Sequence, residues 1–136
     1  MAPIHLNYLA VLIAFVAVFV MGGLWYSPIL FAKRWSELTN VDMSTTSPAM
    51  ALGAQGILTL IEVVSLAVVI SWALPKTVIE GGCVGFLLGA GILAADAGKL
   101  VIFERRPMSL FWINQAYNIL ALTVGGMILA AMPPAM

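Results

Sequence analysis

Apolar residues occur in four long runs along the chain, and each run is long enough to cross a bilayer. A transmembrane helix needs about 20 predominantly apolar residues. The strict alternation of apolar and polar residues that marks an exposed strand is missing from all four runs. We therefore predict an all-α fold, a polytopic membrane four-helix bundle with up-down-up-down topology. The predicted spans are residues 7–26, 49–74, 78–103 and 110–132.

The connections between the runs differ in length. The second and third are short, and short connections place consecutive helices side by side and antiparallel. The first connection, residues 27–47, mixes apolar side chains with the basic pair Lys33 and Arg34, a composition suited to the lipid headgroup region. Because so few residues lie outside the spans, we expect residues 1–136 to form a single integral-membrane domain.

Composition supports a membrane location and excludes several classes of function. The chain of 136 residues is 62% hydrophobic and 9% charged, whereas soluble domains carry about 25% charged residues. Its net charge is zero, so no basic surface for nucleic acid is expected. One histidine and one cysteine, Cys83, cannot form a disulfide within the chain or an ordinary zinc site. We expect no metal site and no cofactor.

Basic residues outside the spans set the expected orientation. The first and third connections hold Lys33, Arg34, Arg105 and Arg106, whereas the second holds only Lys76. By the positive-inside rule the first and third connections face the cytoplasm, so both termini face outward. No Lys or Arg precedes the first run, and we therefore interpret this run as a retained span and not as a signal peptide.

The third run carries a ridge of glycines at a spacing of four residues, formed by Gly81, Gly85 and Gly89. This spacing lets two helix backbones approach closely in lipid. At about 100° per residue of a regular helix, Asp96 falls within roughly 20° of the ridge. Lys99 follows one turn later on nearly the same side. We therefore predict that Asp96 points toward a neighbouring helix and away from lipid.

Polar side chains also share one face of the second run and one face of the fourth. An ionisable group inside a bilayer costs about 2.5–3.5 kcal/mol or more and usually faces the bundle interior, so we expect one shared interior. The second run contributes Gln55, Thr59, Glu62 and Ser65, and the fourth contributes Asn114 and Asn118 with Gln115 beside them. Depth along the helices predicts a cluster in the cytoplasmic half, with Glu62 deeper at the midplane. The predicted cluster consists of Asp96, Lys99, Asn114, Asn118 and Gln55.

The buried carboxylates have two interpretations. A carboxylate held away from water can take up and release protons near neutral pH, so Glu62 and Asp96 are candidates for a proton or cation path. Alternatively, Asp96 pairs with Lys99 or Arg105 and joins two helices. We favour the structural role for Asp96 and Lys99. We favour the functional role for Glu62, which has no complementary charge within one turn of its own helix.

The amides and aromatic residues each have one favoured interpretation and one alternative. We interpret Asn114, Gln115 and Asn118 as groups that hydrogen-bond between helices, with a ligand-binding role as the alternative. Four aromatic residues near the cytoplasmic ends of the spans fit an interfacial belt, with a cage for a quaternary amine as the alternative. These residues are Trp25, Tyr26, Trp35 and Trp112.

Two blocks of sequence carry a resemblance to a known family. The first runs Gly23-Leu24-Trp25-Tyr26-Ser27-Pro28 and continues with Phe31 and Trp35; the second holds Asp96, Lys99, Phe103-Glu104-Arg105-Arg106-Pro107, Phe111, Ile113-Asn114 and Tyr117. They resemble signatures of a family of small bacterial four-helix membrane proteins, catalogued only as a domain of unknown function. The resemblance covers nearly the full length. It implies a four-helix protein of the bacterial cytoplasmic (inner) membrane and supplies no activity.

Three functions are compatible with these features. The first is a small proton- or cation-linked transporter or channel that uses buried carboxylates, expected to be a homo-oligomer because four helices enclose only a narrow pore. The second is a non-catalytic accessory or scaffold subunit of a larger membrane complex. The third, an enzyme acting on lipid or quinone, ranks last because no nucleophile, metal site or phosphate-binding cluster is evident. We therefore expect no catalytic residues, and partners limited to the lipid bilayer and other membrane proteins.

Overall fold

The computed structural model describes residues 1–45 and 47–135, and no strand occurs within these ranges. Four helical segments of the described chain are long and apolar enough to cross a membrane, which confirms the predicted fold class. They begin and end within two residues of the predicted bounds. The segments are α1 (Tyr8–Trp25), α3 (Pro48–Ala73), a continuous segment of α4 (Val78–Phe86), η2 (Leu87–Leu93) and α5 (Ala94–Phe103), and finally α6 (Met108–Ala131).

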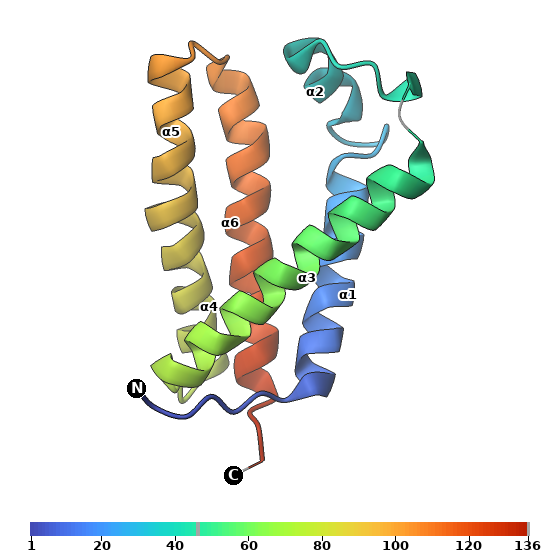
Figure 1. The fold of residues 1–136 in the computed structure, drawn as a ribbon. Helices are drawn as coiled ribbons and strands as arrows, with labels where there is room; N and C mark the ends of the chain where they lie inside the picture. The colour runs from blue at the N-terminus through green and yellow to red at the C-terminus, as the bar shows by residue number, and fades with distance from the viewer. Residues whose placement is uncertain (46, 136) are drawn as a thin grey trace.

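The four segments alternate in direction, as Figure 1 shows. α1 and the α4–η2–α5 segment run toward the end of the bundle that carries the short helix α2 (Ala32–Thr39) and the turn η1 (Met43–Thr45), and α3 and α6 run away from it. Both chain termini lie at the opposite end (Figure 1). The end with α2 also carries the α5–α6 connection. We call it the basic end because it holds Lys33, Arg34, Arg105 and Arg106.

α6 is the central helix of the fold and packs against α1, α3, α4 and α5. α3 is steeply tilted and crosses the bundle diagonally (Figure 1). At the basic end α3 lies on the α1 side of α6, well away from α5 (Figure 1). The two helices joined by the second connection, α3 and α4, therefore come together only near that connection. The helices joined by the third connection lie side by side, as expected.

The apolar core lies between α1, α3 and α6. Small side chains of α1 allow close packing there, and α5 contributes no buried residue at all. The buried core includes Ala10, Ala14 and Val18 of α1, Val63, Leu66 and Ala67 of α3, and Tyr117, Ala121 and Leu122 of α6. Most of α5 is therefore an outer surface of the single chain.

The ends of α1 and α3 are set by local chemistry. The Oδ1 atom of Asn7 accepts two backbone N–H groups from the first turn of α1, the usual arrangement of an N-cap. Its Nδ2 atom donates to the carbonyl of Met132 at 3.2 Å, which joins the start of α1 to the end of α6. α3 ends at Ala73, and the next residue, Leu74, has a left-handed φ of 51°. Pro75 follows and cannot continue the helix.

The glycine ridge of the third span packs against α6. A Cβ atom at Gly81 would collide with the backbone of Gly126, and one at Gly85 would collide with the backbone carbonyl of Leu122. Gly89 also lies against the backbone of α6. The predicted close approach of a neighbouring helix is therefore confirmed, and α6 is that neighbour.

A π-helical segment, η2, separates the glycine ridge from Asp96. The N–H of Ala94 donates to the carbonyl of Gly89, five residues back instead of four. One extra residue in a turn rotates everything after it by roughly 100° relative to a regular helix. The inward face therefore passes from Gly89 to Ala94 and then to Gly98, which lies against Phe111 of α6. Asp96 is turned outward by this shift.

The predicted inward position of Asp96 and Lys99 is consequently wrong. Their side chains are 73% and 67% exposed. The alternative prediction, that Asp96 pairs with Lys99, is confirmed, because Nζ of Lys99 lies 2.9 Å from Oδ1 of Asp96. The pair lies within α5 and does not join two helices of the chain. The prediction failed because it assumed regular α-helical geometry across η2.

Candidate functional site

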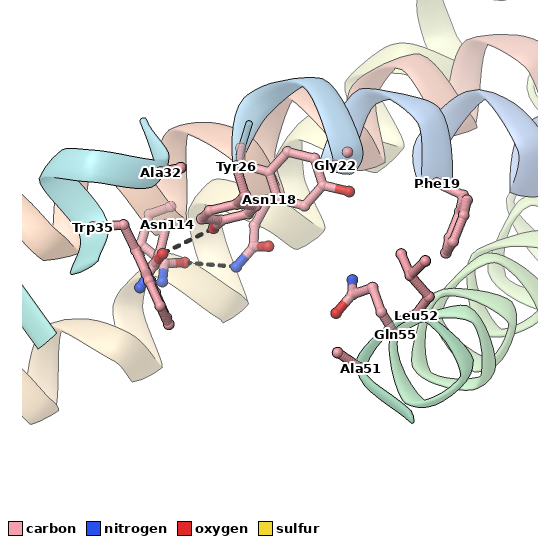
Figure 2. Close-up of a pocket in the computed structure, with 13 residues that line it drawn as sticks. Phe19, Gly22, Tyr26, Ala32, Trp35, Ala51, Leu52, Gln55, Asn114 and Asn118 are labelled. Carbon is pink, nitrogen blue, oxygen red and sulfur yellow. Dashed lines mark hydrogen bonds between the residues drawn. The ribbon is translucent and has the colours of Figure 1, made fainter. Parts of the chain in front are cut away.

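A pocket of about 740 Å³ lies at the basic end, among α1, α2, α3 and α6. Figure 2 shows its side chains, with α3 on one side of the space and α1, α2 and α6 on the other. Its walls combine four amides, four aromatic rings and several small or apolar residues. The lining consists of Gln55, Asn114, Gln115 and Asn118; Phe19, Tyr26, Trp35 and Tyr117; and Gly22, Gly23, Ala32, Ala51 and Leu52. Among the described residues, this lining includes no charged side chain.

The first turns of α6 supply three of the four amides. Residues four apart share a helix face, so Asn114 and Asn118 are presented together, with the buried Gln115 beside them. The hydroxyl of Tyr26 donates to Oδ1 of Asn114 at 2.8 Å, and Nδ2 of Asn118 donates to Oε1 of Gln115 at 3.3 Å (Figure 2). These bonds orient the amides of α6 at the wall of the pocket.

The aromatic residues at the end of α1 turn toward the protein and not toward lipid. Nε1 of Trp25 donates to the carbonyl of Ile113 at 2.9 Å, which fastens α1 to the start of α6. The Tyr26 ring lies edge-on to two other rings of the pocket wall, with centroids 5.6 Å from Tyr117 and 6.3 Å from Trp35. Trp25, Tyr26 and Trp35 are half-buried, whereas Trp112 is 60% exposed, and the interfacial belt expected for all four stays a prediction.

A glycine explains why Tyr117 can reach α1. A Cβ atom at Gly22 would lie only 2.8 Å from the Tyr117 hydroxyl oxygen. Without that atom, the hydroxyl enters the space beside α1 and donates to the carbonyl of Val18 at 2.9 Å. Tyr117 is buried, and it therefore forms a fixed floor for the pocket.

α3 supplies the facing wall. Gln55 extends into the pocket from the opposite side to Asn118 (Figure 2). Its Nε2 atom donates to the hydroxyl of Thr59 one turn further along, at 3.3 Å, and Thr59 is only 1% exposed. The polar face predicted for α3 thus passes from the pocket to the buried Thr59, whereas Ser65, the last residue of the predicted face, is exposed.

Glu62 continues this face of α3 beyond Thr59. It is half-buried and is not part of the pocket lining. The ion pairs found among the described residues join Arg34 with Glu37, Lys99 with Asp96, and Arg106 with Glu104, and none includes Glu62. Glu62 lies three residues after Thr59 on α3, and Thr59 accepts the hydrogen bond of the pocket residue Gln55.

The predicted polar cluster is correct in part. Asn114, Asn118 and Gln55 line one pocket, whereas Asp96 and Lys99 lie on the outer side of α5 and are not brought to it. The sequence suggested an aromatic cage that included Tyr26 and Trp35 only as an alternative, and it did not indicate that Phe19 and Tyr117 would join them. The signal available for Tyr117 was Gly22 near the end of α1, since the absence of a side chain there lets a bulky ring approach.

The chemistry of the pocket is that of an uncharged binding site. Each amide can both donate and accept hydrogen bonds, and the rings offer flat apolar surfaces. Within residues 1–45 and 47–135, no group of three or more His, Cys, Asp or Glu residues could hold a metal ion. The arrangement is suited to holding a small polar molecule by hydrogen bonds and stacking.

Comparison with known proteins identifies the family. No curated protein and no solved structure is similar enough to the chain to count as a match. A family model described as "Protein of unknown function (DUF1761)" matches residues 9–130, which include all four membrane-spanning segments almost completely. The chain therefore belongs to the DUF1761 family of proteins of unknown function.

Proposed function

We propose that this multipass membrane protein is a small proton-linked transporter whose ligand binds in the pocket among α1, α2, α3 and α6. The observation that carries the proposal is the gathering of four amides and four aromatic rings around an uncharged cavity of about 740 Å³. Small-molecule sites combine apolar walls with a few convergent polar groups. In this proposal the protein moves its ligand without changing it chemically.

The lining favours a particular class of ligand. Gln55 and Asn118 offer amides from opposite walls, so a molecule between them is expected to donate and accept hydrogen bonds at both edges. The rings of Tyr26 and Trp35 favour a flat apolar part. Because the described lining has no charge to neutralise a charged ligand, the expected ligand is a small, uncharged, flat polar molecule.

Glu62 is the group that would link transport to protons. Ionisable residues inside membrane spans commonly mark proton or ion pathways. Glu62 is half-buried, carries no salt bridge among the described residues, and follows Thr59, the hydrogen-bond partner of the pocket residue Gln55, by three residues on α3. A change in its protonation would alter the charge next to the binding site, which is a direct way to couple the two.

The proposed setting is the bacterial cytoplasmic membrane, with the basic end inside and both termini outside. The distribution of Lys33, Arg34, Arg105 and Arg106 supports this orientation through the positive-inside rule. The pocket would then open in the cytoplasmic half of the membrane. Ligand from the cytoplasm or the inner leaflet would reach it first.

A flux measurement tests the proposal. The protein is reconstituted in vesicles of phosphatidylcholine and phosphatidylglycerol that contain a pH-sensitive dye, and a mixture of small uncharged aromatic amides and heterocycles is added outside. We expect proton entry to accelerate over protein-free vesicles. Glu62→Gln should return the rate to that of protein-free vesicles. Glu37→Gln is the matched control, since Glu37 is exposed on α2, outside the spans, and its rate should equal that of the unchanged protein.

Two results would contradict the transporter. One is proton entry at the protein-free rate for the correctly folded, unchanged protein, and the other is equal flux in Glu62→Gln. Absence of flux together with a stable set of co-purifying membrane proteins would instead support the alternative function, an accessory or scaffold subunit of a larger complex.

A further inference from the structure

The outer face of α5 carries the charged residues Asp96 and Lys99, which take no part in the interior of the bundle. Its exposed side chains recur at spacings of three and four residues, which is the pattern of a helix that packs against a parallel partner. This face consists of Ile92 of η2, then Ala95, Asp96, Lys99, Ile102 and Phe103 of α5. Nothing in the described part of the chain covers it.

The depth of the Asp96–Lys99 pair makes lipid an unfavourable neighbour. The span of 26 residues is about 39 Å long, which exceeds the hydrocarbon core of about 30 Å by about 4–5 Å at each end. Asp96 lies about 10 Å from the end of the helix at Phe103, and so about 6 Å inside the hydrocarbon of a centred helix. Lys99 can extend toward the headgroups, but the short Asp96 side chain cannot. A charge in lipid at such depth is costly.

The charge arrangement of this face complements itself. Asp96 and Lys99 lie one turn apart on the same side of α5, with opposite charge. A two-fold axis along the membrane normal would place Lys99 of one copy beside Asp96 of another, and the reverse contact would follow by symmetry. The neighbouring Ala95 is small and allows the two helices to approach closely. Within one copy the two side chains pair with each other at 2.9 Å, and contacts between copies would add a second partner to each charge.

We propose that the outer face of α5 is the interface of a homodimer, in which Asp96 of each copy pairs with Lys99 of the other. Both copies have the same orientation in the membrane, and the two α5 helices lie parallel along the axis. The pockets at the basic end stay on the outside of the dimer, one in each copy. The proposed interface does not depend on the proposed transport function, and either proposal can be correct without the other.

Two charge-reversal variants, expressed singly and together with different affinity tags, test the pairing of Asp96 with Lys99. Asp96→Lys gives a copy with two lysines on this face, and Lys99→Asp gives a copy with two aspartates. When either variant is expressed alone, the fraction of protein recovered as a dimer should fall by about tenfold or more, because like charges face each other across the interface. Expressed together, the two should recover wild-type co-purification in mild detergent, and light scattering should give the mass of a dimer.

A cross-linking measurement keeps the test decisive even if a charge variant folds poorly. In a Cys83→Ser background, Ala95→Cys should form a disulfide-linked dimer in vesicles under mild oxidation. Leu58→Cys is the control, since Leu58 is exposed on α3, outside the proposed interface, and should stay uncross-linked.

Three results would overturn the proposal. They are a monomeric wild-type protein without Ala95→Cys cross-links, a dimer that survives both single charge substitutions, and a failure of co-expression to restore pairing. Retention of anionic lipid by a monomeric wild-type protein, lost in both variants, would assign the charges to a lipid headgroup and would likewise exclude the dimer.

Discussion

The two halves of α6 differ in what lies against them. In the half near the chain termini, α6 meets the glycines of α4 so closely that backbone touches backbone at Gly85 and Leu122. In the half at the basic end, α6 carries Asn114 and Asn118 and faces a pocket. The helix is continuous from Met108 to Ala131, so the contrast comes from the side chains and from the neighbours, not from a break in the helix.

The contrast shows how one short chain combines a rigid contact with an open site. Because glycine has no side chain that could rotate when α6 shifts relative to α4, the α4–α6 contact fixes the position of α6. The tilt of α3 then takes it away from α5 at the basic end (Figure 1). Amide and aromatic side chains, together with small and apolar ones, line the resulting space. The close contact of α6 with α4 thereby also fixes the half of α6 that lines the pocket.

Substitution of Gly85 should have the largest effect on stability. In Gly85→Val, the new side chain collides with the carbonyl of Leu122, and overpacking of this kind costs about 1–3 kcal/mol or more. The thermal midpoint in detergent, followed by tryptophan fluorescence, should fall sharply. Gly53→Ala is the control, because a Cβ atom at Gly53 meets nothing within 4 Å, and its midpoint should be unchanged or slightly higher. Equal midpoints for both variants would show that the glycine half is not rigid.

Removal of the Tyr117 hydroxyl should have an intermediate effect. Tyr117→Phe loses the buried bond to the Val18 carbonyl, and one such bond contributes about 0.5–1.5 kcal/mol. Tyr8→Phe serves as the control, since Tyr8 is 80% exposed at the start of α1, and it should not change the midpoint. If Tyr117→Phe were as stable as Tyr8→Phe, the floor of the pocket would not help to hold α1 against α6.

Substitution of Asn118 should separate stability from ligand binding. Its hydrogen bond stays within α6, to Gln115, so Asn118→Leu should cost about 0.6 kcal/mol or less. The same change removes one of the two facing amides of the pocket and should strongly reduce ligand-dependent proton entry in vesicles. A large loss of stability with unchanged flux would mean that the amides serve packing and not binding.

The smallest effect on stability is expected from protonation of Asp42, in the connection that leads from α2 to α3. The pKa of the Asp42 carboxyl is held below its usual range by hydrogen bonds from Ser44, whose backbone N–H lies 2.9 Å from Oδ1. A carboxyl with a lowered folded-state pKa stabilises the turn above its unfolded pKa of about 3.9, and the contribution disappears as the pH falls through the folded value. Amide exchange at Ser44 should therefore quicken, relative to the intrinsic rate at each pH, only in acid. Asp42→Asn should abolish this pH dependence while both halves of α6 keep their stability.

Local sequence was sufficient to predict the bounds of the spans and the amide residues that line the pocket. Span bounds follow from hydropathy, which is a property of consecutive residues, and Asn114 and Asn118 are adjacent on any regular helix. The same regularity predicted the contact between the glycines and a neighbouring helix. It failed at Asp96, because one residue of extra π-helical turn in η2 is enough to move a side chain from the inside of a bundle to the outside.

The sequence by itself determined that the protein is helical, where its four spans begin and end, and which faces of α3 and α6 are polar. Only the tertiary structure decided which polar groups meet. The tilt of α3 and the inward turn of Tyr26 and Trp35 depend on contacts between residues far apart in the chain, such as Trp25 with Ile113 and Tyr117 with Val18. The physical reason is that hydropathy acts residue by residue, whereas the rotation and tilt of a helix are set by what packs against it.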